Sequence, residues 1–160
     1  MRERIPLLTF AMVTIVSTIA LIYSFSAYFG AYTALRMFDV SIPDFNVIEF
    51  NATQIHIETI LALDNPASQE FQALYFEQRI YLNGEFFTFT RPEEPKERNP
   101  MRIAPRSSTN MTIDTEVPKT KIELYRETQE QSWFTSVLVV LEGPIIGRYW
   151  LTISRQIPTS

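Results

Sequence analysis

The chain has no cysteine, a single histidine and only four glycines in 160 residues. The lack of cysteine excludes a disulfide scaffold, a thiolate metal site and a cysteine nucleophile. One histidine excludes a histidine-rich metal centre, and four glycines leave little scope for phosphate-binding loops; the P-loop and dinucleotide glycine patterns do not occur. We therefore expect no cofactor, no metal site and no enzymatic activity.

Charge is absent from the N-terminal part, because no Asp, Glu, Lys or Arg occurs between Arg4 and Arg36. At about 1.5 Å per residue, a helix over residues 5–35 exceeds the roughly 30 Å hydrocarbon layer of a bilayer. A cleaved signal peptide is the alternative, but its apolar region has only about 7–15 residues and needs small residues at the cleavage site. That pattern is poor here, so we predict a retained transmembrane anchor over residues 1–36. A juxtamembrane linker (37–44) and a β-rich domain (45–160) would follow.

The flanking charges predict the orientation of this segment. Arg2 and Arg4 precede it, whereas Asp39 and Asp44 follow it. Because basic residues favour the cytoplasmic side, we expect a single-pass protein of the cell membrane with a cytoplasmic N-terminus and an extracytoplasmic C-terminal domain. Aromatic residues gather in the second half of the segment, as in the belt at a membrane interface: Tyr23, Phe25, Tyr28, Phe29 and Tyr32.

Small residues form a stripe down one face of the expected helix, at alternating spacings of three and four. Such stripes let a second membrane helix approach closely, although small residues are also common in membrane helices generally. We expect contact with lipid and with other membrane protein subunits, or self-association, through this helix-packing stripe. Its members are Ser17, Ala20, Ser24, Ala27, Ala31 and Ala34.

Beyond the anchor, residues 37–160 contain 11 Lys and Arg against 17 Asp and Glu. This acidic balance has the wrong sign for a nucleic-acid surface, so no nucleic acid is expected as a partner. Two glycosylation sequons, at Asn51 and Asn110, lie on the expected outer side of the membrane. A polar turn is an equally good interpretation of either sequon.

Alternating apolar residues predict β-strands throughout this region. An Asn83-Gly84 pair is typical of a hairpin turn between two of them. We expect strands over residues 54–63, 73–82, 85–90, 109–117, 133–141 and 148–157, a long proline-rich connection over 91–107, and a short helix or edge strand over 119–131. About seven short strands without long helices between them predict an all-β antiparallel sandwich.

The stretch ILALDNPASQEFQALYFEQRIYLNGEFF resembles the start of the late-embryogenesis-abundant group-two family, also called the water-stress and hypersensitive-response (WHy) domain. The matching positions are Asn65 and Pro66, where an apolar strand ends, and Gly84 before a later strand. The resemblance implies an immunoglobulin-like or fibronectin-like sandwich, often behind a membrane helix, without catalytic residues to carry over. It covers residues 45–157 and is weakest after Val117.

His56 has Glu58 two residues away, on the same face of an expected strand. A catalytic pair would also need a nucleophile or a substrate pocket, and the sequence supplies neither, so we interpret His56 as a structural or surface residue. The acidic run at residues 93–97 mixes charge signs with proline and indicates a solvated loop rather than a calcium site.

Adjacent aromatic pairs must point to both faces of a strand, so one member of each pair faces outward. Outward aromatic residues are candidates for a protein contact surface, although a sandwich with a covered outer face gives the same pattern. The candidate contact aromatics are Tyr75, Tyr81, Phe87, Trp133 and Trp150.

These observations favour a non-enzymatic, membrane-anchored sandwich that serves as an accessory subunit of a larger membrane assembly. A free-standing envelope protein that protects against water stress is the second hypothesis. A pilin-like filament subunit is less favoured, because the expected leader ending in glycine is missing and no acidic residue lies at the start of the apolar run itself, from Ile5 onward. An enzyme with an unrecognised site ranks last.

Overall fold

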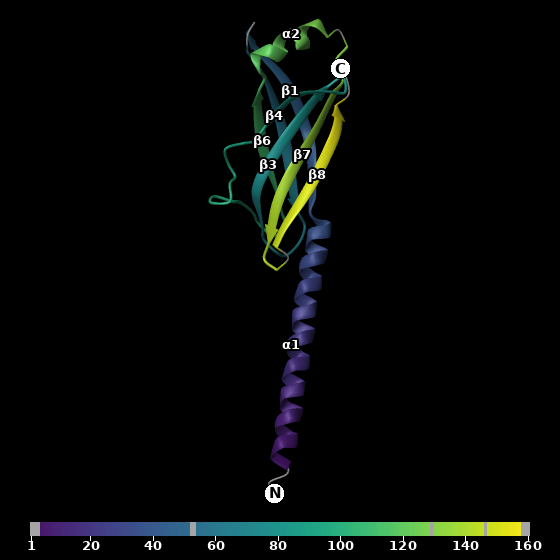
Figure 1. Cartoon of the computed structure of the whole chain (residues 1–160), viewed down its shortest axis with the longest axis vertical. Coiled ribbons are helices and arrows are strands. Elements are labelled where there is room, and N and C mark those ends of the chain that lie inside the picture. The colour runs from purple at the N-terminus through teal and green to yellow at the C-terminus, as the bar shows by residue number, and fades with distance from the viewer. Residues whose placement is uncertain (1–3, 52–53, 129, 146, 158–160) are drawn as a thin grey trace.

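The computed structural model describes residues 4–51, 54–128, 130–145 and 147–157. A long helix, α1 (Arg4–Met37), extends from one end of a β-rich body (Figure 1). Within the described part of the chain, α1 alone is long and apolar enough to cross a membrane. Near an N-terminus this length and composition suit a membrane span and a signal sequence alike.

The body consists of two antiparallel sheets. Sheet one has the strand order β1-β2-β6, with β1 (Asp39–Asn51), β2 (Gln54–Asn65) and β6 (Ser107–Glu116). Sheet two has the order β4-β3-β7-β8, with β3 (Phe71–Leu82), β4 (Glu85–Thr90), β7 (Trp133–Gly143) and β8 (Gly147–Ile157), and β5 (Met101–Ile103) also pairs with β3. Helix α2 (Lys119–Glu127) lies at the end of the body far from α1 (Figure 1).

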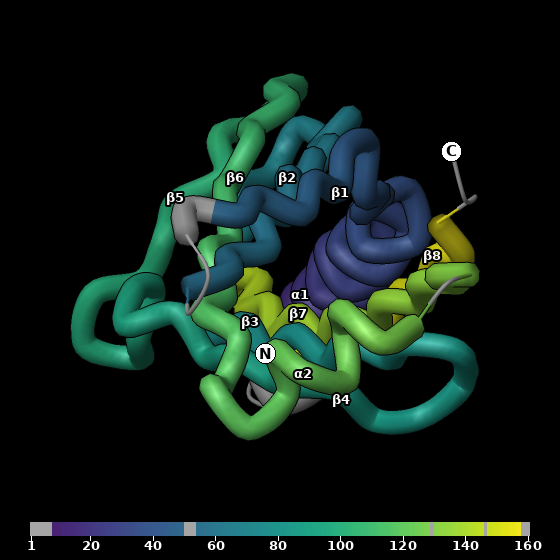
Figure 2. Tube along the Cα trace, turned by 90° about the horizontal axis from the view of Figure 1, so that it is seen from above, coloured from purple at the N-terminus to yellow at the C-terminus, as the bar shows by residue number. Residues whose placement is uncertain are grey.

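Seen from above, the two sheets form separate layers with α1 end-on between them (Figure 2). The predicted antiparallel β-sandwich behind an apolar helix is therefore confirmed. Strands β1 and β8 adjoin along one side of the sandwich. There Arg155 Nη1 donates a hydrogen bond to the backbone oxygen of Ile42.

The two layers enclose a continuous apolar interior. Strand β2 buries every second residue, and Ile55, Ile57, Leu61 and Leu63 are fully inaccessible to solvent, as the alternation predicted. One cluster of buried residues fills the half near α1, and a second, which includes Trp133, fills the half near α2. Burial of alternate residues on both facing sheets is the usual source of sandwich stability.

The last turns of α1 belong to the first of these clusters. Ala34 and Leu35 are 5% and 8% exposed, and they pack with Phe38 against the sandwich interior. The ring of Phe38 meets that of Phe71 edge-on at 5.3 Å between centroids. The helix is therefore joined to the body by hydrophobic packing as well as by the chain itself.

Three expectations from the sequence were wrong in detail. The linker predicted over residues 37–44 does not form, because β1 begins at Asp39 directly after the helix. The predicted connection over residues 91–107 contains the short strand β5. Alternation along the expected strand 73–82 places Leu74 on the core face with Phe76, but Leu74 lies at a register shift between Ala73 and Tyr75 and lines an outer hollow instead. For residues 119–131, the helical alternative is the one that forms, as α2.

Candidate functional site

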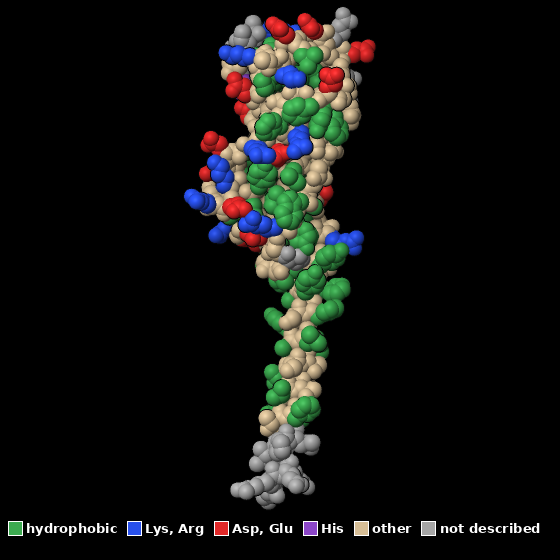
Figure 3. All heavy atoms as spheres, viewed as in Figure 1, with side chains coloured by type: hydrophobic (Ala, Val, Ile, Leu, Met, Phe, Trp, Pro, Cys, Tyr) green, Lys and Arg blue, Asp and Glu red, His purple; other side chains and the backbone are tan. Residues whose placement is uncertain are grey.

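The outer face of sheet two carries exposed aromatic residues and a cluster of charged side chains. Its strand register places four rows of outward side chains across β3, β7 and β8. The two middle rows are mostly polar or charged, and the two outer rows contain aromatic residues. The middle rows are Glu77, Leu138 and Thr152, and Arg79, Ser136 and Ser154. Hydrophobic side chains interrupted by charges are visible along this face in Figure 3.

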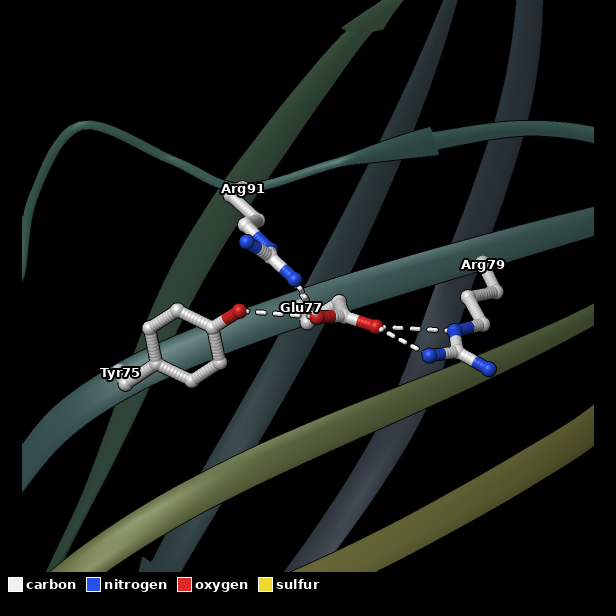
Figure 4. Close-up of polar contacts among 4 residues, drawn as sticks. All are labelled: Tyr75, Glu77, Arg79 and Arg91. Carbon is white, nitrogen blue, oxygen red and sulfur yellow. Dashed lines mark hydrogen bonds and ion pairs between the residues drawn. The ribbon is translucent and has the colours of Figure 1, made fainter.

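Glu77 lies on β3 in one of the two middle rows, and its side chain is only 7% exposed. Tyr75 donates a hydrogen bond from its hydroxyl to Glu77 Oε2 at 2.8 Å, and Arg91 Nη2 donates to the same oxygen at 2.7 Å (Figure 4). Arg79 Nε donates to Oε1 at 2.8 Å. One carboxylate thus organises a tyrosine and two arginines, which together we call the Glu77 cluster.

These contacts hold the carboxylate in its ionised form. The hydrogen bond from Tyr75, followed by those from Arg91 and Arg79, lowers the pKa of Glu77 from its ordinary value of 4.5 to about 2. Burial and the neighbouring carboxylate raise the pKa of the Tyr75 hydroxyl. A carboxylate this acidic cannot act as a proton donor near neutral pH, so the Glu77 cluster is suited to positioning its arginines rather than to acid catalysis.

Both arginines in the cluster face solvent, with 58% of each side chain exposed. Arg91 also stacks against aromatic rings, since its guanidinium carbon lies 5.7 Å from the centroid of Tyr75 and 6.0 Å from that of Phe89. Such stacking restricts the side chain while it leaves the remaining N–H groups free to meet a partner. The face therefore presents oriented positive charge bordered by aromatic surface.

An aromatic row crosses the sheet on the α2 side of the cluster. Tyr81 lies between Phe86 and Phe134, with centroid distances of 5.9 Å and 5.6 Å. Phe86 is 50% exposed, and Phe89 on the same strand is 56% exposed. Rigid, exposed aromatic side chains of this kind are typical of protein contact surfaces.

A hollow of about 580 Å³ lies on the α1 side of the cluster. The nearly buried Leu74 and Val140 line it together with Tyr75 and with Trp150, which is 65% exposed. Residues 96–98 contribute to the lining, and Glu97 accepts a hydrogen bond from Arg148 Nη1 at 2.6 Å. The hollow is open and apolar, with charged groups among its lining residues.

The structure divides the predicted contact aromatics into two groups. Tyr75, Tyr81 and Trp150 lie on the outer face, as expected for a contact surface. Phe87 and Trp133 do not, because they are 2% and 6% exposed and pack edge-on against each other at 5.3 Å in the second core cluster.

Alternation correctly predicted that one residue of each adjacent aromatic pair faces outward. It did not predict which of the two residues that is. In the pair at the start of β7, Trp133 is opposite the core residue Leu82, so Phe134 faces outward. In β4, Phe86 is opposite the outer-face residue Tyr81 and Phe87 is the buried member. The prediction of Phe87 and Trp133 as contact residues was therefore wrong.

The helix-packing stripe is also divided. Ala31 and Ala34 are 1% and 5% exposed because they pack against the body of this same chain, so they are unavailable to a partner helix. The lower members remain accessible: Ser17, Ala20 and Ser24 are exposed and Ala27 is half-buried. A shorter stripe than the sequence predicted is thus open to a second helix.

The family-motif residues have clear structural roles. Asn65 is fully buried, and its Nδ2 donates to the backbone oxygens of Gln69 and Ala104 at 2.8 Å and 2.9 Å, while its Oδ1 accepts from the N–H of Ala67 at 3.2 Å. Pro66 follows at the exposed end of β2. Gly84 has φ of 82° in the tight turn between β3 and β4, a conformation that favours glycine.

The asparagines of the two sequons lie on different strands of sheet one. Asn110 is exposed on the edge strand β6, where its side chain is accessible to modification. Asn51 ends β1, but its side chain and the rest of that sequon lie outside the described residues.

His56 contacts a different carboxylate from the one that the sequence suggested. Its Nδ1 lies 3.0 Å from Oδ1 of Asp114 on the neighbouring strand β6. In the described part of the chain, no group of three or more His, Asp or Glu residues could hold a metal ion. His56 and Asp114 thus form a cross-strand pair on the surface of sheet one.

Sequence reasoning missed the Glu77 cluster, although half of its signal was present. Tyr75, Glu77 and Arg79 alternate within the expected strand 73–82, and alternation places them on one face. Arg91 lies in the expected proline-rich connection over 91–107, so nothing in the local pattern placed it beside Glu77. Arg91 reaches Glu77 only through the fold, 14 positions along the chain.

No protein-family model and no curated protein sequence matches this chain. Solved structures of similar fold do exist. A protein of Arabidopsis thaliana covers 73% of the chain, and is itself covered over 77%, at 15% identity and a TM-score of 0.59. A protein provisionally described as a late embryogenesis abundant (LEA) protein covers 93% of the chain, and is itself covered over 85%, at 11% identity and a TM-score of 0.59.

A third similar structure, a protein of Bordetella pertussis provisionally described as ApaA, covers 75% of the chain and is itself covered over 91%. Its identity is 12% and its TM-score is 0.52. Identities this low establish the likeness of fold alone. The resemblance to LEA-type domains seen in the sequence thus has a counterpart in the three-dimensional architecture.

Proposed function

We propose that this protein is a non-enzymatic, single-pass membrane protein whose extracytoplasmic β-sandwich acts as an accessory subunit of a larger membrane assembly. The observation that carries the proposal is the burial of Ala31, Ala34 and Leu35 in the sandwich. A helix that completes the core of its own domain cannot be removed without exposing that core. This favours a retained anchor over a cleaved signal sequence.

The rest of α1 suits a bilayer. Residues 8–30 are exposed or half-buried, are free of charge, and at about 1.5 Å per residue extend over about 35 Å, slightly more than the hydrocarbon layer. Arg2 and Arg4, which precede the uncharged stretch, favour a cytoplasmic N-terminus. The sandwich would then stand on the outer surface, with the face of sheet two directed along the membrane.

Two surfaces would hold the protein in an assembly. The accessible part of the helix-packing stripe, Ser17, Ala20 and Ser24, would contact another membrane helix within the lipid. The outer face of sheet two would contact the partner outside the membrane through exposed aromatic residues and the oriented arginines of the Glu77 cluster. The LEA-type fold likeness is consistent with a role without catalysis.

Extraction in mild detergent, followed by native mass determination, tests the proposal. We expect a stoichiometric set of bound partners. Leucine at Ala20 and Ser24 should release them by blocking close helix approach, whereas leucine at Thr18, an exposed residue outside the stripe, should not. A lone monomer from native membranes would contradict the accessory role.

Topology can be tested separately because the chain has no native cysteine. A Thr120→Cys variant in α2 should react with a membrane-impermeant maleimide on intact cells. Protection of that cysteine until the cells are lysed would contradict an extracytoplasmic sandwich, whatever the partners.

A second candidate function is protection of the envelope during water stress, in the manner implied by the WHy-family resemblance. The fold likeness to a protein provisionally described as a LEA protein favours it. It predicts a stable monomer and a phenotype of the deletion strain only under drying or osmotic challenge. A growth defect of that strain in unstressed medium would favour the accessory role instead.

A further inference from the structure

The turn between β7 and β8 exposes apolar side chains at the helix end of the sandwich (Figure 1). Pro144 is exposed, and Ile145 is 49% exposed at the tip. Proline is an ordinary turn residue, because Gly, Pro, Asn, Asp and Ser dominate turns, whereas a large apolar side chain such as Ile145 is not. The fold of the isolated chain leaves about half of Ile145 exposed at this tip.

This turn lies beside α1. The side chain of Gln69 approaches the helix so closely that a Cβ on Gly30 would lie 3.9 Å from its Nε2. Gln69 also lines a hollow of about 670 Å³ whose other lining residues include Pro144 and Ile145. Gln69 thus connects the β7–β8 turn to the part of the helix around Gly30.

The length of the helix sets where that part lies relative to a bilayer. Counted from the end of the charged N-terminus, about 20 residues cross a 30 Å hydrocarbon layer, which places the outer boundary near Ser24. The following turns carry Phe25, Tyr28 and Phe29, all exposed, which suits the headgroup layer. Gly30, and with it the β7–β8 turn, then falls in the same layer.

We propose that the β7–β8 turn is a second membrane contact, with Pro144 and Ile145 inserted into the headgroup layer of the outer leaflet beside the anchor. This inference rests on the proposed function, because it requires α1 to span the bilayer. The lipid surface is the occupant because the turn continues the exposed apolar surface of α1, and because the packing of Ala34 and Leu35 fixes the sandwich on the helix.

Nearby charges define the kind of lipid. Glu70 and Glu142 line the same hollow as Ile145, and Glu142 lies 4.0 Å from the guanidinium of Arg148. Two carboxylates beside the insertion point disfavour a strongly anionic surface. Zwitterionic headgroups are therefore the expected neighbours of the turn.

Spin labels on single cysteines test the contact in the full chain, reconstituted in phosphatidylcholine vesicles. The labelled positions are Ile145→Cys in the β7–β8 turn, Ile19→Cys in the helix and Glu85→Cys at the start of β4, directly after the β3–β4 turn. The last is a matched control, because β3–β4 is a tight turn at the opposite end of the same sheet. Collision rates with oxygen and with a water-soluble nickel chelate report the depth of each label.

We expect the label at Ile19 to be deep, that at Glu85 to be aqueous, and that at Ile145 to be shallow, with accessibility to nickel at least threefold below that at Glu85. An Ile145 label as accessible to nickel as the Glu85 label, with Ile19 still deep, would overturn the second contact and leave the anchor in place. An aqueous label at Ile19 would instead overturn the proposed function itself.

Discussion

Gln78 Nε2 donates a hydrogen bond to Thr59 Oγ1 at 2.7 Å, from the inner face of one sheet to the inner face of the other. The same nitrogen donates to Thr135 Oγ1 at 3.0 Å, and Thr115 Oγ1 donates to Gln78 Oε1 at 3.4 Å. All four side chains are buried. A polar network thus joins the two layers between the two apolar clusters.

Replacing Gln78 with methionine should lower the free energy of unfolding by about 2–4 kcal/mol, because it leaves three buried hydroxyls without their partner. Urea unfolding of the detergent-solubilised chain, followed by tryptophan fluorescence, measures the change. If valine is then placed at the three threonines, most of the loss should be recovered, since no buried polar group remains unpaired. A Gln78→Met variant as stable as the native chain would contradict the importance of this network.

Glu77 should make the fold sensitive to acid. Because its pKa falls from 4.5 to about 2 on folding, the carboxylate stabilises the native state above pH 4.5, and this contribution is lost as the pH falls toward 2. A Glu77→Gln variant should be less stable at neutral pH by about 1–3 kcal/mol and should show a flatter stability profile over that pH range.

Glu97 provides the control for this prediction. It pairs with Arg148, but its side chain is 66% exposed. Glu97→Gln should therefore change the free energy of unfolding by less than about 1 kcal/mol. Equal effects of the two substitutions would show that burial does not strengthen the Glu77 contacts.

Truncation of the two tryptophans should affect stability very differently. Trp133→Ala should cost about 3–5 kcal/mol, because it opens a cavity beside Phe87 in the second core cluster. Trp150→Ala, at a site that is 65% exposed, should leave the unfolding midpoint nearly unchanged while it weakens retention of any partner. Circular dichroism measures the first effect and co-purification the second.

Asn65 should tolerate almost no substitution. Asn65→Asp replaces an amide N–H₂ group that faces two backbone carbonyl oxygens with an oxygen, at a cost of about 2–3 kcal/mol. Asn110→Asp, on an exposed strand position, should change stability by less than about 0.5 kcal/mol. Thermal unfolding of the two variants under identical conditions provides the comparison.

The sequence predicted most of the fold because alternation is a local signal. The buried face of β2 and the hairpin at Asn83 and Gly84 follow directly from neighbouring residues. Local signals fail where one residue is inserted into a strand, as at Leu74, since everything before the insertion changes face.

The candidate site was harder to predict because it depends on contacts between distant segments. Arg91 reaches Glu77 across 14 positions of the chain, and Phe87 is buried beside a tryptophan 46 positions later. No spacing rule connects such pairs. Likewise, the small-residue pattern of α1 identified a packing surface but gave no indication that Ala31 and Ala34 pack within the chain itself.

The packing of α1 into the sandwich couples the motion of the two. Since Leu35 and Phe38 hold the helix in the core, the helix and the sandwich rotate together, without a swivel between them. If α1 spans a bilayer as proposed, a partner helix that contacts Ser17 and Ala20 within the lipid would also fix the direction in which the Glu77 cluster faces. A rotation or tilt of the membrane helix would then turn the outer face of sheet two by the same angle.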